Sequence, residues 1–351
     1  MIITLLKSSF ILGCTAFGGP AAHIALLQRE WIDGKKWATH NEFLNMLAIT
    51  NLIPGPNSTE MVMHMGQHRA GYKGLIVAGT FFILPAAVLT ALLTHFYQVS
   101  QTIPVAAAAF YGISICVLAL IVVALLKLGK KVLVSWSLVP WAVAAGVLTF
   151  LEVPEFIGIL GLAVGAFLVH QIKRKVHSLE PVSLTMFAVH MAKIGSVLFG
   201  SGYVLIAYLE RTFIDDLKWI TQAELLDVVA LGQLTPGPVL TTATALGQLL
   251  FGWPGAIVGT LAIFLPAFIG VALNHSYFIT HKPQWLEAII PPINAAVLGM
   301  MGVVLVQMGI HLEWTLAGAI AFPIYFLLLY KTSVPTLLMF GVAALLGVLG
   351  V

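Results

Sequence analysis

Two stretches built around a Pro-Gly-Pro triplet decide how this chain folds: Asn51-Leu52-Ile53-Pro54-Gly55-Pro56 and Gly232-Gln233-Leu234-Thr235-Pro236-Gly237-Pro238. Each triplet interrupts an apolar stretch, about 42–66 and about 224–250, and leaves about 12 residues on either side. A proline ends a helix, and the glycine between two prolines allows the chain to reverse. Because a crossing needs about 20 apolar residues, each stretch is predicted to be a re-entrant hairpin of two half-helices. A kinked full span is the alternative.

The composition around these hairpins is that of a polytopic membrane protein. Of 351 residues, 60% are hydrophobic and 9% are charged, against about 25% charged in an average soluble domain. This excludes an ordinary soluble enzyme, a nucleic-acid binder and a disordered chain. Long continuous apolar runs favour helices over a barrel of alternating strands. Cys14 and Cys116 both lie in apolar stretches, so no disulfide framework is expected.

The apolar runs predict ten full spans in an all-α fold. The first run has no basic segment before it, so it is interpreted as a retained span and not as a signal peptide. The predicted spans are 3–28, 74–96, 104–127, 132–149, 155–172, 183–208, 255–278, 286–308, 312–330 and 335–351.

The two halves of the sequence repeat each other. When Phe17 is placed on Phe199, 18 of the next 40 positions match without a gap, and the two triplets coincide. The prediction is therefore a first repeat over 1–175, a linker over 176–182 and a second repeat over 183–351. Each repeat has about five transmembrane helices and one re-entrant Pro-Gly-Pro hairpin. An odd number of crossings gives the second repeat an inverted topology.

The distribution of basic residues supports this inversion. In the re-entrant arrangement, 13 of the 17 lysines and arginines fall on one side of the membrane, which the positive-inside rule makes cytoplasmic. If the interrupted stretches crossed fully, the basic loops would be divided between both sides. Both termini are then predicted to be periplasmic or extracellular.

Inverted repeats with broken helices are typical of secondary transporters, in which half-helix N-termini point at an anionic substrate. Small polar residues follow both triplets, and glycine breaks interrupt the first span of each repeat. For Asn57 and Glu60 a capping box is the alternative, and for the glycines close helix packing. The hairpin tips are Pro54, Gly55, Pro56, Pro236, Gly237 and Pro238. The candidate substrate-binding residues that follow the tips are Asn57, Ser58, Thr59, Thr241 and Thr242. Those at the glycine breaks are Gly18, Gly19, Gly200 and Ser201.

Lys193 is the charge that lies deepest in a predicted span, and Lys7 lies one helical turn from the matching position. An intramembrane charge predicts a functional site, so Lys193 is a candidate substrate ligand; snorkelling to the interface is the alternative.

The remaining charged candidates have two interpretations each. Arg29 with Asp33 and Arg211 with Asp215 form either plain i,i+4 ion pairs or an electrostatic gate. Glu60 and Asp227 are the carboxylates inside the hairpins and are candidates for a coupling proton. His23, His64 and His190 are weaker candidates.

No catalytic or metal-binding spacing is present in the sequence, so no enzyme activity, metal or cofactor is expected.

These motifs resemble the chromate transporter family in its long, two-domain form. The resemblance rests on Ala16-Phe17-Gly18-Gly19-Pro20, Gln28-Arg29-Glu30-Trp31, Phe199-Gly200-Ser201-Gly202-Tyr203, Gly252-Trp253-Pro254-Gly255 and the two triplet stretches. It implies export of chromate across the bacterial inner membrane, driven by an ion gradient, with sulfate as the isosteric competitor. The second repeat has Gly-Ser-Gly where the first has Gly-Gly-Pro, so the two halves of the site are expected to differ.

Chromate efflux by secondary active transport is therefore the predicted function. The alternatives are sulfate uptake or exchange, a passive anion channel, and a membrane enzyme acting on lipid phosphate. The expected partners are the oxyanion and the lipid bilayer, and no nucleic acid is expected. A homodimer is a further possibility.

Overall fold

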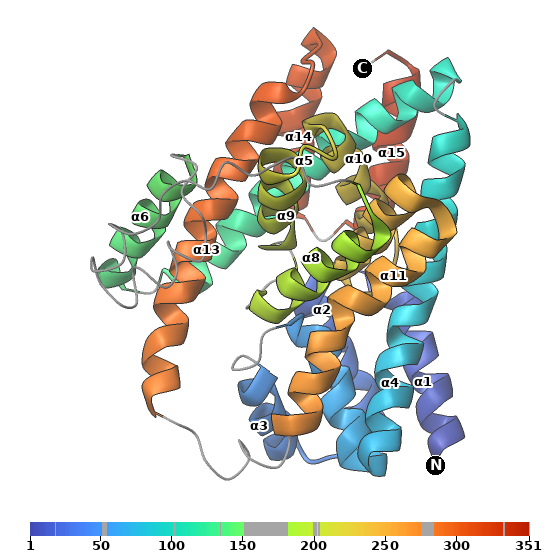
Figure 1. Cartoon of the computed structure of the whole chain (residues 1–351), viewed down its shortest axis with the longest axis vertical. Helices are drawn as coiled ribbons and strands as arrows, with labels where there is room; N and C mark the ends of the chain where they lie inside the picture. Colours follow the sequence, from blue (N-terminus) through green and yellow to red (C-terminus); the bar gives the residue numbers. More distant parts are fainter. Residues whose placement is uncertain are drawn as a thin grey trace.

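A computed structural model of the chain describes residues 1–17, 19–50, 55–100, 103–133, 135–150, 182–198, 202, 204–274, 284–332 and 334–350. These residues form helices and turns, without a strand (Figure 1). The helices of the first half are α1 (Ile2–Thr15), α2 (Gly19–Leu27), α3 (His40–Thr50), α4 (Asn57–Ser100), α5 (Pro104–Val132) and α6 (Val139–Phe150). Those of the second half are α8 (Leu184–Val197), α9 (Val204–Leu209), α10 (Gln222–Gln233), α11 (Thr242–Asn274), α13 (Gln284–His311), α14 (Leu316–Lys331) and α15 (Thr336–Val348).

Four stretches of the described chain are long and apolar enough to cross a membrane: Asn57–Ser100, Pro104–Lys130, Val239–Leu273 and Asn294–His311. They contain the expected spans 74–96 and 104–127 and overlap the expected spans 255–278 and 286–308, and they confirm an all-α polytopic membrane protein. The expected spans 132–149, 312–330 and 335–351 correspond to the shorter helices α6, α14 and α15. The expected span 155–172 and residues 176–181 of the linker lie outside the described residues.

Both Pro-Gly-Pro stretches reverse the chain as predicted. Glu42 at the start of α3 lies 3.6 Å from His68, near the end of the first arm of α4, so the two arms are antiparallel. In the second half the rings of Trp219, just before α10, and Phe251, at the end of the first arm of α11, are 6.3 Å apart. Each hairpin therefore returns to the end of the molecule from which it started.

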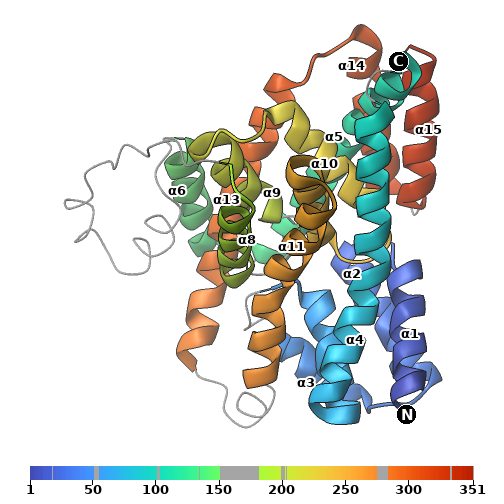
Figure 2. The same cartoon turned by 45° about the vertical axis from the view of Figure 1, so that its right-hand side comes forward.

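After each hairpin the chain turns sharply and continues as the second arm of α4 or α11. The turns fall at Gly71 and Gly252, whose φ angles of +59° and +63° lie in the left-handed region that glycine tolerates. From these turns α4 and α11 run in opposite directions along the long axis of the fold (Figures 1 and 2).

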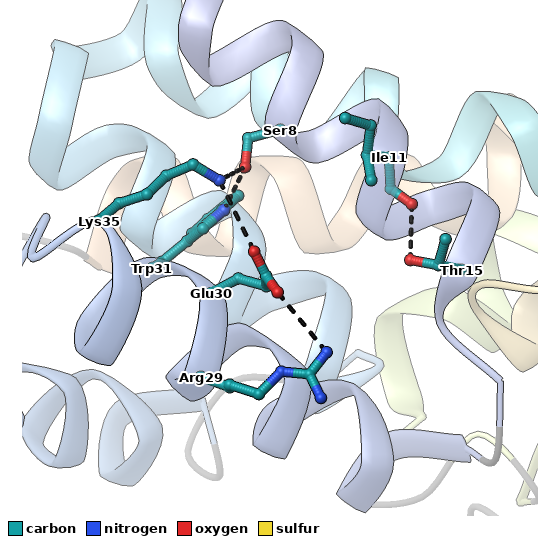
Figure 3. A network of polar contacts seen from close by, with 7 residues as sticks. All are labelled: Ser8, Ile11, Thr15, Arg29, Glu30, Trp31 and Lys35. Atoms are coloured by element: carbon teal, nitrogen blue, oxygen red, sulfur yellow. Dashed lines mark hydrogen bonds and ion pairs between the residues drawn. The ribbon is translucent and has the colours of Figure 1, made fainter.

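The first expected span, 3–28, is not a single helix, and this expectation was wrong. Ser8 Oγ accepts a hydrogen bond from Trp31 Nε1 at 2.7 Å and one from Lys35 Nζ at 2.8 Å (Figure 3). In a continuous helix, residues 8 and 31 would lie about 35 Å apart along the axis. The break after Ala16 instead folds α2 and the π-helical turn η1 (Gln28–Gly34) back along α1.

The span expected over 183–208 is folded back in the same way. The rings of His190 in α8 and Phe213 in the π-helical turn η3 (Glu210–Asp216) are 6.1 Å apart. These two residues stand at the positions equivalent to Ser8 and Trp31. Each half therefore begins with two short helical hairpins in place of one span and one hairpin.

The two halves also repeat unusual local geometry. The π-helical turns η1 and η3 occupy equivalent positions, and each is followed by a lysine with a positive φ angle, +52° at Lys36 and +58° at Lys218. Glu42 accepts the backbone N–H of Thr39 at 2.7 Å, and Glu224 accepts that of Thr221 at 2.8 Å. This repetition supports the duplication that the sequence predicts.

The N terminus and the C terminus lie at opposite ends of the long axis in both views (Figures 1 and 2). The expectation that both termini share one side of the membrane does not agree with this arrangement. Because α1 and α2 fold back, the N terminus lies at the same end as Lys35.

Candidate functional site

The two halves meet where their broken helices end. The backbone N–H of Gly55, in the first triplet, donates to the carbonyl of Leu198 at 2.6 Å. Reciprocally, the N–H of Gly237, in the second triplet, donates to the carbonyl of Ala16 at 2.7 Å. Leu198 stands where Ala16 stands in the first half, so each hairpin tip is bonded to the helix break of the other half. We call this region the tip junction.

Both tip glycines are required by the close contact between the halves. Gly237 has a φ angle of +96°, and a Cβ atom there would lie 2.8 Å from Cβ of Ala86. A Cβ atom at Gly55 would lie 3.1 Å from Cβ of Ala267, the residue that matches Ala86. The backbone at each tip can therefore approach α4 or α11 of the opposite half only without a side chain.

His23 links the first tip to the second through the first break. Its Nε2 lies 3.0 Å from the Ala16 carbonyl, and its Nδ1 lies 3.2 Å from Ser58 Oγ. Because a carbonyl only accepts hydrogen bonds, Nε2 carries the proton, and Nδ1 of the neutral ring accepts from the serine hydroxyl. Ser58, His23, Ala16 and Gly237 thus form one continuous hydrogen-bonded path inside the protein.

The residues that follow the first tip are buried polar groups. Ser58, Thr59 and Glu60 expose 2%, 0% and 0% of their surface. Among the described residues, Thr59 Oγ1 and both carboxylate oxygens of Glu60 have no hydrogen-bond partner. Buried polar atoms without partners are costly, so these three oxygens are available to a proton or a ligand. Asn57 is half-buried and begins α4.

The residues that follow the second tip are also buried, but their hydroxyls are satisfied locally. Thr241 donates to the Pro238 carbonyl at 2.9 Å, and Thr242 donates to the Val239 carbonyl at 2.8 Å. Before the tip, the Thr235 hydroxyl lies 3.0 Å from that of Thr90 on α4. Pro56, Pro236 and Pro238 are buried in the same region.

Several candidate residues fall where little is described. Gly18, Pro54, Gly200 and Ser201 lie outside the described residues, and Gly19 is described only as the first residue of α2.

Lys193 is not among the buried residues of the described chain, and its role as a substrate ligand stays a prediction. Its side chain is exposed, as is that of Lys7. The buried face of α8 consists of Phe187, Met191, Ile194 and Gly195, and Lys193 is not on it. Among the described side chains, none of the buried polar residues is a lysine or an arginine.

Arg29 and Arg211, the arginines of the two predicted pairs, both lie in π-helical turns, η1 and η3. Arg29 pairs with its neighbour Glu30 at 3.5 Å, and not with Asp33 as expected (Figure 3). Arg211 lies 3.7 Å from Asp216, one residue beyond the expected Asp215, which is half-buried in the same turn. A π-helical turn brings residues i and i+5 together, which explains the Asp216 pair.

Asp227 lies in a different polar environment from Glu60. Its Oδ2 accepts a short hydrogen bond from Tyr97 on α4, and Ser114 Oγ on α5 lies 3.5 Å from Oδ1. These residues line a cavity of about 440 Å³ that includes none of the tip residues.

Sequence reasoning underestimated His23 and did not find Tyr97, Ser114 or the Thr90–Thr235 contact. Each of these groups has its partner on another helix, so spacing along the chain carries no signal for it. A signal for buried glutamines was present: Gln67 and Gln248 match after the one-residue slip between the repeats, and they expose 8% and 1% of their surface.

Comparison with known proteins identifies the class to which this fold and junction belong. The model of the chromate transporter family matches residues 3–168 and again residues 185–348. The chain therefore belongs to the chromate transporter family, and it is a multi-pass membrane protein of a transporter family.

Curated relatives agree with this assignment along most of the chain. A probable chromate transport protein of Synechococcus elongatus is 27% identical, over 96% of this chain and 93% of its own length. A chromate transport protein of Cupriavidus metallidurans is 27% identical, over 82% of this chain and 78% of its own. A chromate transport protein of Pseudomonas aeruginosa is 28% identical, over 83% of this chain and 77% of its own length. No solved structure matches the chain.

No group of three or more histidine, cysteine, aspartate or glutamate side chains that suits a metal ion occurs in the part of the chain that the structure describes.

Proposed function

We propose that this protein is a secondary active transporter that exports chromate and holds it at the tip junction. The reciprocal pair of hydrogen bonds, Gly55 to Leu198 and Gly237 to Ala16, carries this proposal. It joins four chain breaks from two halves at one buried place, and irregular backbone inside a membrane protein is tolerated where it surrounds a site.

The oxyanion is bound by neutral donors. Thr59 supplies a hydroxyl without a partner among the described residues, and the backbone N–H groups of Asn57 and Ser58 begin α4 beside it. Ser58, Thr241 and Thr242 can donate to the oxyanion when their hydroxyls turn away from His23, Pro238 and Val239. A dianion that leaves water needs several hydrogen bonds to replace its hydration. Backbone and hydroxyl donors also favour a small tetrahedral oxyanion over a planar carboxylate, for which arginine is the usual partner.

Sulfate shares the charge and shape of chromate, so it is expected to compete at the same site. Sulfate uptake or exchange through this junction is the second candidate function. Membership of a transporter family argues for transport over catalysis on a lipid phosphate, and the enclosed junction argues against an open anion channel.

The two halves are inverted repeats related by an axis in the membrane plane. Opposite directions of α4 and α11, and the reciprocal bonds at the junction, support this arrangement. Lys35 and Arg69 lie over the ring of Trp37, just before α3, at the end of the molecule with the N terminus, whereas in the second half Arg211 is paired with Asp216. By the positive-inside rule the N terminus is then cytoplasmic and the C terminus is periplasmic.

Uptake of radiolabelled chromate into everted membrane vesicles tests the function. A proton gradient should drive accumulation by the wild type, and excess sulfate should reduce it. A Thr59→Val variant, which keeps side-chain shape, should bind chromate at least about tenfold more weakly, because it removes a hydrogen bond to a charged group. Equal affinity in the variant and the wild type would contradict a site at the tips.

A further inference from the structure

The cavity beside Asp227 is a second polar site, separate from the tip junction. It has a volume of about 440 Å³ and lies between the ends of α4, α5, α10 and α13. Its polar lining includes Tyr97, Tyr111, Ser114, Asp227, His311 and Glu313. Both halves of the chain contribute to it.

The charges of this cavity are wrong for the oxyanion. Asp227 and Glu313 line it, Glu224 stands one helical turn before Asp227 on α10, and no lysine or arginine is among the lining residues. Two or three carboxylates repel a dianion and attract a cation. The cavity is therefore suited to bind a coupling cation and not the anionic substrate.

Among the groups that line this cavity, the carboxylate of Asp227 is the one best placed to bind and release a proton. Its carboxylate accepts from the hydroxyl of Tyr97 and lies within 3.5 Å of that of Ser114, so both neighbours are neutral donors without a competing cation. Glu313 and His311 are exposed at the rim. In the first half the equivalent position is Asn45, an exposed residue that does not titrate, so the feature belongs to one half only.

The hydrogen bond between Asp227 and Tyr97 also joins the two halves, because Tyr97 lies on α4 and Asp227 on α10. A hydrogen bond to an ionised carboxylate is roughly twice as strong as one between neutral groups. A proton on Asp227 therefore weakens a contact between the parts that must move relative to each other during transport.

We propose that Asp227 binds the coupling proton, taken up from the cavity at the end of the molecule opposite the N terminus. This inference rests on the proposed transport function and adds to it a cation site outside the substrate site. Proton binding loosens the link between α4 and α10, and proton release restores it, so that one step of the transport cycle depends on protonation.

The test compares Asp227→Asn with Glu313→Gln, a matched loss of one carboxylate from the same cavity. In reconstituted vesicles, Asp227→Asn should lose at least about tenfold of chromate uptake driven by a proton gradient. Chromate–chromate exchange without a gradient should stay within about twofold of the wild type, because the tip junction is intact. Glu313→Gln, which removes an exposed carboxylate from the rim of the cavity, should reduce gradient-driven uptake much less than Asp227→Asn and should retain chromate exchange.

Tyr97→Phe provides a second variant that keeps the carboxylate and the ring. Loss of its hydroxyl removes a donor to the ionised form, so the pH at which gradient-driven uptake is half-maximal should rise by about one unit. Infrared difference spectra of purified protein report the proton directly: a carboxyl band that grows as pH falls should be absent in Asp227→Asn and shifted to higher pH in Tyr97→Phe.

Gradient-driven uptake by Asp227→Asn equal to that of the wild type, or an infrared band unchanged in this variant, would overturn the proton site. If Asp227→Asn does not reach the membrane, an unchanged pH profile and an unchanged band in Tyr97→Phe overturn it instead. Absence of chromate exchange by the wild type contradicts the proposed function and leaves the infrared result to decide the proton site.

Discussion

The two hairpin tips have the same backbone and different chemistry. After the first tip the chain reads Asn57-Ser58-Thr59-Glu60, and after the second it reads Val239-Leu240-Thr241-Thr242. Both tips donate one backbone hydrogen bond to a helix break of the other half, at 2.6 and 2.7 Å. Only the first tip carries a serine bonded to a histidine and a buried carboxyl group. In the second half the positions of His23 and Ser58 are occupied by Leu205 and Leu240.

The outer ends of the two halves differ in the same way. At the first end, Trp37 packs against Trp31 and is covered by Arg69 at 4.6 Å and Lys35 at 5.4 Å. At the second end, the equivalent Trp219 packs against Phe213 and Phe251. In the proposed arrangement the duplicated backbone closes around one site, and the side chains of the two ends differ because only the first end is proposed to face the cytoplasm.

The largest effect is expected at the tip glycines. Gly237→Ala forces a side chain into the left-handed region and onto Ala86, so we expect a loss of about 1–3 kcal/mol of stability and of nearly all transport. The measurement is chromate uptake normalised to protein in the membrane. Gly341→Ala, at a helical glycine with nothing within 4 Å, is the control and should be close to wild type. Full uptake by Gly237→Ala would refute the need for close contact at the tip.

Changing the first half to the chemistry of the second sharpens the comparison. His23→Leu or Ser58→Leu alone leaves a buried polar group unpaired and should cost about 1–3 kcal/mol of unfolding free energy. The double variant removes both partners, so it should cost less than the sum of the single variants. It should nevertheless weaken chromate binding, because a hydroxyl donor is lost. Thermal unfolding in detergent and equilibrium chromate binding give both numbers, and additive losses would contradict the pairing.

A smaller effect is expected at the outer end of the first half. Arg69→Leu introduces the residue type of the second half and removes the cation from Trp37, which should cost about 0.5–1 kcal/mol. Lys73→Leu removes the same charge from the same end without a ring contact and is the control. Uptake by both variants should fall moderately at low salt and converge with the wild type at high salt. A stability loss equal in both variants would exclude the ring contact as its cause.

The smallest effect on stability is expected at the N-terminal caps of α3 and α10, where both halves have the same hydrogen bonds. Thr39→Ala and Thr221→Ala each remove a helix cap and should each lower stability by about 1 kcal/mol. Two clearly different losses would show that the halves diverge in backbone as well as in side chains.

At the first of these caps, pH provides an additional check. The backbone N–H of Thr39, followed by its hydroxyl, holds the pKa of Glu42 below its usual value. The stabilisation by this group is therefore present at neutral pH and is lost as the pH falls through the lowered pKa. Thermal unfolding of Thr39→Ala should depend less on pH in the acidic range than that of the wild type.

Much of the architecture could be predicted because it depends on local signals. The Pro-Gly-Pro triplets, the repeat and the long apolar helices are visible in residue order alone. The fold-back of 3–28 was missed, although its Phe-Gly break was noticed, because a mostly apolar stretch of 26 residues is long enough to span. Only the contact of Ser8 with Trp31 and Lys35 shows that this segment reverses.

The site was predicted in outline and not in its chemistry. Ser58, Thr59, Thr241 and Thr242 could be placed near the tips because each follows a triplet. The exposure of Lys193 could not be predicted, because its place within an apolar run gives its position along the chain but not the face of α8 on which it lies. His23 was underestimated, because its partners Ala16 and Ser58 belong to different elements.

The most direct test of the tip junction is to locate the anion itself. Crystals of the wild-type protein grown with chromate would give an anomalous signal from chromium. The account predicts one strong peak at the junction, next to the hydroxyls of Ser58 and Thr59 and the second tip at Thr241. A peak confined to the cavity at Asp227 or to the basic residues around Trp37, with the tips empty, would contradict it.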